Sequence, residues 1–217
     1  MPYTQKFNFD YQPQSMPIQQ DNSYQLVNQI FHHLMGKNQG QETPYQPQDQ
    51  YGYHRPQENA KYNPYSGQGN PLMEMLRHRE SGGNYGAQNN LGYQGGYQFG
   101  AAALEDLGLL HPGTSRGGNA AMNNPNNWTI PGGLEAFLSN PQLQDEAMKA
   151  YMEHNRRQLE QTGLINPDTS PEEVNAMLAA AHLGGVGGVK AMKRGHNRRD
   201  AYGTSIRDYY RMGLGTV

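Results

Sequence analysis

The chain has 217 residues, of which 35% are hydrophobic and 17% charged, and its formal net charge is −2. Cysteine is absent, which excludes a disulfide framework, a cysteine-ligated zinc site and a cysteine nucleophile. The sequence holds no run of about 18 apolar residues and lacks a strong positive charge, so we expect neither a membrane span nor a nucleic-acid partner.

Residues 1–70 form a segment of unusual composition, with 14 Gln, 8 Tyr and 7 Pro but few large aliphatic side chains. Such a segment cannot bury enough apolar surface to offset roughly 1–2 kcal/mol per residue of lost backbone entropy, so we expect a disordered tail. Within it, apolar spacing predicts a short helix over residues 23–35, which either docks on a partner or packs on the main domain. The first residues lack the pattern of a secretory signal peptide.

The remaining residues, 71–217, are enough for a single hydrophobic core, and their patterning is mainly helical. Apolar spacing and helix-start residues predict helices over 71–81, 101–107, 133–137, 140–159, 170–183 and 205–212. A small hairpin or irregular ribbon is expected over residues 84–100, which are rich in Gly and Tyr. Ser170 and Glu173 have the spacing of a capping box, and glycines at 184–188 are expected to interrupt the chain after the fifth helix.

Glu80 is the candidate catalytic residue. It follows Leu76 by four residues and Leu72 by eight, so helical spacing places it on the apolar stripe of its own helix. It also lies in the last turn, where the helix dipole is negative. Burial and the dipole both disfavour the carboxylate, so we expect a raised pKa, as a general acid requires. The alternative is a surface glutamate at a frayed helix end.

Four short motifs follow one another along this part of the chain. They are Glu-Ser-Gly-Gly-Asn at 80–84, Gly-Tyr-Gln-Phe at 96–99, Ala-His-Leu-Gly-Gly-Val-Gly-Gly-Val at 181–189 and Arg-Asp-Tyr-Tyr at 207–210. In the same order they resemble the motifs of lytic transglycosylases: Glu-Ser, Gly-Leu-Met-Gln or Gly-Leu-Tyr-Gln-Phe, Ala-Tyr-Asn-x-Gly-x-Gly-x-Val and Arg-Asn-Tyr-Val. The resemblance covers roughly residues 71–217 and none of the tail.

The resemblance implies a goose-lysozyme-like, mainly α-helical (α+β) domain that cleaves the glycan strands of peptidoglycan without a cofactor or metal. In this family one glutamate, here Glu80, protonates the glycosidic oxygen between N-acetylmuramic acid and N-acetylglucosamine. It then takes the proton of the muramyl C6 hydroxyl, whose oxygen attacks C1 and closes a 1,6-anhydro ring. A chain offering one well-placed carboxylate suits this reaction better than the paired carboxylates of most glycoside hydrolases.

The motif positions also imply substrate-binding roles. These fall to Ser81 beside the acid, to Gly96, Tyr97 and Gln98 in the second motif, to His182 in the third, and to Tyr209 in the fourth. Tyr209 is expected to approach Glu80 or the sugar, with a core tyrosine as the alternative. His182 and Leu183 depart from the Tyr-Asn of the family, which leaves their roles open. The eight histidines predict no metal site, because only the tail pair at 32 and 33 is closely spaced.

Residues 101–217 look most like versions of this family found in bacteriophage particles. This implies a virion-associated enzyme that is held to a virion structural protein by its tail and acts on the host cell wall in the periplasm at infection. Two alternatives stay open. One is a goose-type muramidase, in which water replaces the C6 hydroxyl; the other is an inactive wall-binding structural protein of the virion, for which the departures at 182 and 183 are the sequence hint.

Overall fold

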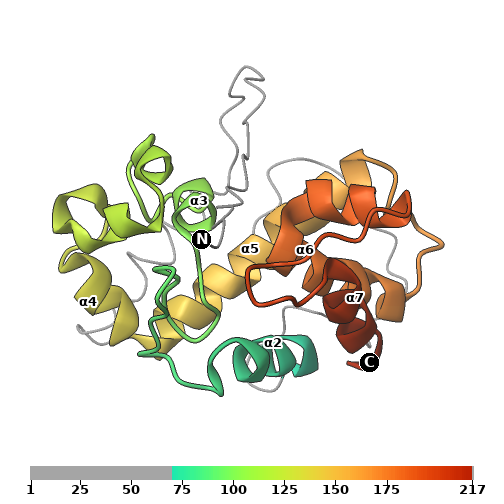
Figure 1. The fold of residues 1–217 in the computed structure, drawn as a ribbon, viewed down its shortest axis with the longest axis horizontal. Helices are drawn as coiled ribbons and strands as arrows, with labels where there is room; N and C mark the ends of the chain where they lie inside the picture. Colours follow the sequence, from blue (N-terminus) through green and yellow to red (C-terminus); the bar gives the residue numbers. More distant parts are fainter. Residues whose placement is uncertain (1–69, 217) are drawn as a thin grey trace, which may run out of the picture.

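The structure, a computed structural model, describes residues 70–216, and in this range it is mainly α-helical (Figure 1). The predicted tail and its helix at 23–35 lie outside the described residues. The α-helices are α2 (Pro71–Ser81), α3 (Ala101–Asp106), α4 (Gly133–Leu138), α5 (Pro141–Gln161), α6 (Pro171–Lys193) and α7 (Ile206–Leu214). Short 3-10 helices follow α3: η1 (Thr114–Gly117), η2 (Asn119–Asn123) and η3 (Pro125–Asn127). All six helices predicted from the sequence are therefore present, but α6 continues past its predicted end at residue 183 to Lys193.

The segment between α2 and α3 is an irregular ribbon, as predicted. Between residues 70 and 216, β-pairing is confined to isolated bridges, and two of them, Gln88 with Gln94 and Gln94 with Phe99, lie in this ribbon. The ribbon folds back on itself, because Gln94 and Phe99 exchange backbone hydrogen bonds of 3.0 and 2.8 Å. Within this fold, the carbonyl oxygen of Gly96 lies 2.8 Å from Oγ of Ser81, at the end of α2.

Helices α2, α5, α6 and α7 begin at side chains that accept from their free backbone N–H groups. Asn70 accepts a 3.0 Å hydrogen bond from the N–H of Met73 and so starts α2. A complete capping box starts α7, where Ser205 and Asp208 bond reciprocally. At the start of α6 only half of the predicted box forms, because the carboxylate of Glu173 binds Lys193 Nζ at 2.6 Å instead.

Glycines let α6 and α7 pack closely. Over residues 184–188, where the sequence predicts an interruption, the structure has a kink in α6. The helix bends at Gly185, whose backbone has φ 63° and ψ 175°, and then continues to Lys193. A Cβ on Gly188 would lie 2.6 Å from Ile206 Cδ1. On the other helix, a Cβ on Gly213 would lie 2.6 Å from the carbonyl oxygen of Asn175. Because Gly188 and Gly213 have no side chain, α6 and α7 can approach each other closely at these positions.

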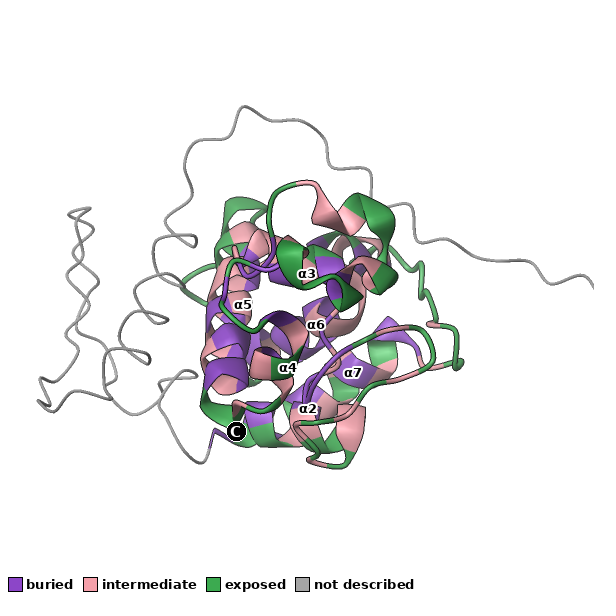
Figure 2. Cartoon of the chain, turned by 90° about the vertical axis from the view of Figure 1, so that its left-hand side faces the viewer, coloured by how far each residue is buried: buried purple, intermediate pink, exposed green. Residues whose placement is uncertain are grey.

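The helices form two groups joined by α5 (Figure 1). One group contains α3, α4 and the 3-10 helices, and the other contains α6 and α7. Helices α5 and α6 carry many of the buried residues, as Figure 2 shows. Helix α2 contributes Leu72 and Leu76, both fully buried, to the same core. The end of α2 therefore lies where it can meet side chains from α6 and α7.

Candidate active site

The site is built around Glu80, at the end of α2. Leu72 and Leu76 are fully buried on the same stripe of the helix, and the Glu80 side chain is 16% exposed. Gly82 ends the helix in the left-handed conformation, with its N–H directed back to the carbonyl groups of Arg77 and His78. The predicted position of Glu80 on the apolar stripe is confirmed. Its carboxyl group lies at the edge of the core and keeps some contact with solvent.

Two side chains from distant parts of the chain meet this carboxyl group at the same oxygen. The hydroxyl of Tyr209, on α7, donates a hydrogen bond to Oε1 of Glu80. Nε2 of His182, on α6, lies 3.3 Å from the same Oε1. Three helices thus converge on one carboxyl group. Tyr209 approaches Glu80, as one sequence-based interpretation expected, and it is also buried in the core, as the alternative expected.

The pKa of Glu80 is lowered, so the predicted rise is wrong. Burial raises the pKa, but several neighbours favour the carboxylate and prevail. They are the hydrogen bond from His182 and its charge when the ring is protonated, the hydrogen bond from Tyr209, and the charge of Arg79. Burial and the negative charge of Glu80 raise the pKa of Tyr209, which keeps this hydroxyl protonated as a donor. Free of substrate, the site therefore favours the ionised form of Glu80 near neutral pH.

His182 is held in an aromatic cage. Its side chain is 6% exposed, and its ring lies edge-on to Phe99 and Tyr151, with centroids 6.4 and 6.2 Å away. Tyr209 lies on a further side, with a centroid distance of 6.4 Å. Nδ1 is buried and has no hydrogen-bond partner among the residues that the structure describes. His182 therefore directs one nitrogen to Glu80 and buries the other among aromatic rings.

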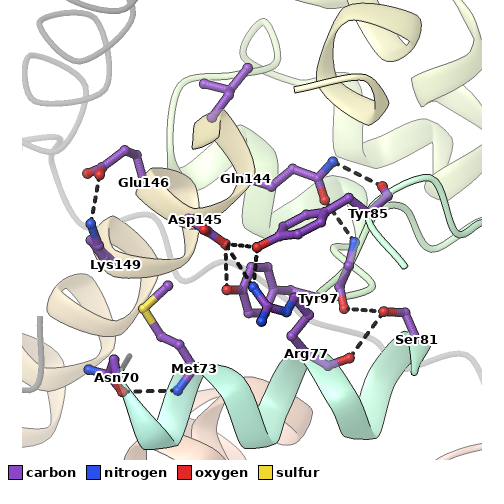
Figure 3. A network of polar contacts seen from close by, with 12 residues as sticks. Asn70, Met73, Arg77, Ser81, Tyr85, Tyr97, Gln144, Asp145, Glu146 and Lys149 are labelled. Atoms are coloured by element: carbon purple, nitrogen blue, oxygen red, sulfur yellow. Dashed lines mark hydrogen bonds and ion pairs between the residues drawn. The ribbon is translucent and has the colours of Figure 1, made fainter. Parts of the chain in front are cut away.

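Ser81 and Gly96 join α2 to the ribbon. Oγ of Ser81 lies 2.8 Å from the carbonyl oxygen of Gly96 and 3.1 Å from that of Arg77, in reach to donate to either (Figure 3). The N–H of Gly96 donates to Oε1 of Gln144, on α5, at 2.8 Å. Both polar groups of the Gly96 backbone are thus engaged within the protein. These two residues fix the chain that follows Glu80.

Tyr97 lies in the core, which corrects the expectation that it lines the substrate surface. It is fully buried, and its hydroxyl donates to Oδ1 of Asp145 at 2.7 Å (Figure 3). Gln98 shapes the ribbon, since its φ is 50° and its Nε2 donates to the carbonyl oxygen of Gly95 at 2.9 Å. Leu183, the other departure from the family motif, is partly buried and packs against the core.

A second polar cluster, which the sequence analysis missed, lies between α2, the ribbon and α5. Oδ1 of Asp145 accepts from the hydroxyls of Tyr97 and Tyr85, the latter at 2.6 Å, and Arg77 donates to Tyr85 (Figure 3). Gln144 is fully buried and anchors the ribbon through the backbone of Gly96 and the carbonyl oxygen of Tyr85. Helical spacing places Gln144 among the apolar residues of α5. A polar residue at such a position is the sequence signal that could have identified this cluster.

The loop before α7 also reaches the site. Nη2 of Arg79 donates to Oγ1 of Thr204 at 3.1 Å, next to Glu80. Farther out, the hydroxyl of Tyr202 donates to Oδ1 of Asn90, in the ribbon, at 2.6 Å, although the Tyr202 side chain is 65% exposed. This loop therefore links the end of α2 with the ribbon and leaves an aromatic ring in solvent.

Other polar features of the fold are separate from Glu80. The carboxylate of Glu105 accepts backbone hydrogen bonds from Gly113 and Ser115 at 2.8 and 2.6 Å, which lower its pKa against the effect of burial. Glu105 is therefore engaged in holding its loop. Two surface hollows lie elsewhere, one beside α4 and one between the ends of α5 and α6, and Glu80 lines neither. The chemistry of the Glu80 cluster, rather than a hollow, marks the candidate site.

Comparisons with known proteins give no relative: no family model matches the chain, and searches of curated proteins and of solved structures found no match. Among residues 70–216, no helix has the length and apolar character to cross a membrane. The same part of the chain holds no cluster of three or more His, Asp or Glu arranged to bind a metal.

Proposed function

We propose that this protein cleaves the glycan strands of peptidoglycan as a lytic transglycosylase, with Glu80 as acid and then base. One observation carries the proposal. Glu80 and Tyr209 belong to two separate motifs that resemble this family, 129 residues apart, and the fold brings them into hydrogen-bond contact. The carboxyl group where they meet is mostly buried yet retains solvent contact. Partial burial strengthens electrostatic interactions with a bound substrate while leaving the group accessible.

The proposed reaction needs one carboxyl group. In the first step protonated Glu80 donates its proton to the glycosidic oxygen, and the bond between that oxygen and C1 of N-acetylmuramic acid breaks. In the second step the Glu80 carboxylate takes the proton from the C6 hydroxyl as its oxygen bonds to C1. The proton lost in the first step is regained in the second, so Glu80 returns to its starting state. Tyr209, which donates to the carboxylate, stabilises it between the two steps.

The test is digestion of purified peptidoglycan by the wild type, Glu80→Gln and Glu74→Gln, with mass spectrometry of the released fragments. Glu74 is the matched control, because it lies on the same helix but is exposed. We expect 1,6-anhydro products from the wild type and Glu74→Gln, and none from Glu80→Gln. Products with reducing ends would instead identify a goose-type muramidase that uses the same acid.

An inactive protein would give a third pattern. If the wild type binds peptidoglycan but releases no fragments at any pH, the chain is a wall-binding structural protein and the transglycosylase proposal is overturned. The proposal also places the enzyme in the virion of a bacteriophage, with the host cell wall in the periplasm as its site of action and the tail as its attachment. Immunoblotting of purified particles tests this placement, and absence from them would contradict it.

A further inference from the structure

We infer that His182 is a positioning residue: together with Tyr209 it occupies Oε1 of Glu80, so that the proton exchanged with the glycan is carried on Oε2. The inference rests on the proposed function and deepens it, because it assigns the two oxygens of the acid to different tasks. It also gives His182 a role through Glu80 rather than through contact with the sugar.

Two groups approach Oε1 of Glu80. The Tyr209 hydroxyl donates to this oxygen, and His182 Nε2 lies 3.3 Å from it. A carboxylate oxygen offers about two lone-pair sites, so Oε1, with both groups against it, has little room for a third partner. Between residues 70 and 216 the structure shows no hydrogen bond to Oε2, and this oxygen is not among the buried atoms without a partner. Oε2 is thus the oxygen open to a ligand.

The two ring nitrogens of His182 have different surroundings. Nδ1 is buried and has no hydrogen-bond partner in the described part of the chain. The rings of Phe99 and Tyr151 lie edge-on to the His182 ring. Nε2 faces Oε1 of Glu80 at 3.3 Å. An N–H on Nε2 can therefore donate to Glu80, whereas Nδ1 has no such partner.

The acid strength of Glu80 depends on the groups around the pair. The titratable or charged groups that face His182 and Glu80 are Tyr209 from α7, Tyr151 from α5 and Arg79 from α2. Burial raises the pKa of Glu80, and hydrogen bonds from His182 and Tyr209 oppose it. Without the hydrogen bond from His182, fewer interactions oppose the effect of burial on the pKa of Glu80, so this pKa rises. His182 therefore sets the acid strength of Glu80 as well as its orientation.

The experiment compares the wild type with His182→Phe, which keeps an aromatic ring but has no donor, and His182→Gln, which keeps an N–H donor. His78→Gln is the matched control, because His78 is exposed on α2. The pKa of Glu80 is measured by carbon NMR of labelled glutamate, with Glu80→Gln identifying the signal. We expect His182→Phe to raise the pKa by about one unit and His182→Gln to restore most of the change.

The rate of peptidoglycan cleavage against pH gives the second readout. The alkaline limb, where Glu80 loses its proton, moves to higher pH in His182→Phe and stays in place in His78→Gln. Tyr209→Phe removes the other donor and is expected to move the pKa in the same direction, which provides a test if His182→Phe does not fold. A folded His182→Phe protein with an unchanged Glu80 pKa would overturn the inference.

The two proposals fail separately in this design. The NMR titration needs no substrate, so an inactive wild type would contradict the proposed function while the Glu80 pKa still tests His182. Conversely, an active wild type whose His182→Phe variant keeps the same alkaline limb would keep the transglycosylase and remove the positioning role.

Discussion

Helix α2 takes part in two polar clusters that differ in how fully their groups are paired. Toward α5, Gln144 is bonded at both its oxygen and its nitrogen, and Asp145 accepts from two tyrosines. Toward α6 and α7, two donors crowd one oxygen of Glu80, and Nδ1 of His182 has no partner among the described residues. A buried network whose members are satisfied fixes structure, whereas an unevenly paired one keeps groups available for a ligand. The cluster around Gln144 and Asp145 is therefore the one to test for stability, and the Glu80 cluster is the one to test for chemistry.

The largest expected effect is on activity at the unevenly paired cluster. Glu80→Gln should lower the rate of glycan cleavage by about 10²–10⁴-fold, because the amide cannot donate or take the proton. The fold should persist, since the amide oxygen still accepts from Tyr209. The rate of fragment release measures the loss of activity, and the circular dichroism spectrum shows whether the fold persists. A cleavage rate close to that of Glu74→Gln would refute the assignment of the acid.

The matching change in the paired cluster should act on stability. Gln144→Ala should lower the free energy of unfolding by about 2–4 kcal/mol, because it leaves the buried N–H of Gly96 without an acceptor. Urea denaturation measures this, with exposed Gln142→Ala as the control. The comparison predicts that folded Gln144→Ala still cleaves peptidoglycan. Loss of activity without loss of stability would contradict the division between the clusters.

Close packing of α7 on α6 positions Tyr209 and His182. Adding one methyl group at the contact between the two helices tests whether this packing is needed. Gly213→Ala should destabilise the protein by about 1–3 kcal/mol, because the added Cβ would lie 2.6 Å from the carbonyl oxygen of Asn175 and 2.7 Å from Cα of Ala176. Gly187→Ala is the control, since a Cβ there meets nothing within 4 Å. Equal melting temperatures for the two variants would show that the contact is not needed.

A change of pH should move activity and stability in opposite directions at the Glu80 cluster. The pKa of Glu80 is lowered from its ordinary value of 4.5, so the carboxylate stabilises the fold above that pH. This contribution is lost as the pH falls through the folded pKa, while the acid form needed for cleavage grows. We therefore expect cleavage to speed up from pH 7 toward mildly acidic pH. The stability difference between wild type and Glu80→Gln should shrink from pH 7 to pH 3, and a constant difference would contradict the lowered pKa.

The smallest expected effect concerns the hydrogen bond between Tyr202 and Asn90, which lies outside both clusters. Tyr202→Phe should change the free energy of unfolding by no more than about 0.5 kcal/mol, because the side chain is 65% exposed. Urea denaturation of this variant beside Gln144→Ala compares an exposed polar contact with a buried one. A loss comparable to that of Gln144→Ala would show that the loop belongs to the paired cluster.

The sequence by itself determined where the helices lie and where Glu80 stands on one of them. Proline at the first helical position, capping side chains such as Asn70 and Ser205, and apolar spacing act through hydrogen bonds and contacts within a few residues. These local signals placed all six helices, and they placed Glu80 on the buried stripe at a helix end. The order of motifs further indicated Tyr209 as a neighbour of Glu80.

Only the tertiary structure decided the electrostatics of the site. The dipole of α2 and burial both suggested a raised pKa for Glu80, yet donors brought from α6 and α7 lower it. Tyr97 and Gln144 likewise owe their roles to contacts across 48 residues of chain, which no local pattern records. Helix formation depends on near neighbours in sequence, but a pKa depends on every charge and donor near in space. Folding therefore selects which of the residues on one helix do chemistry and which hold the fold.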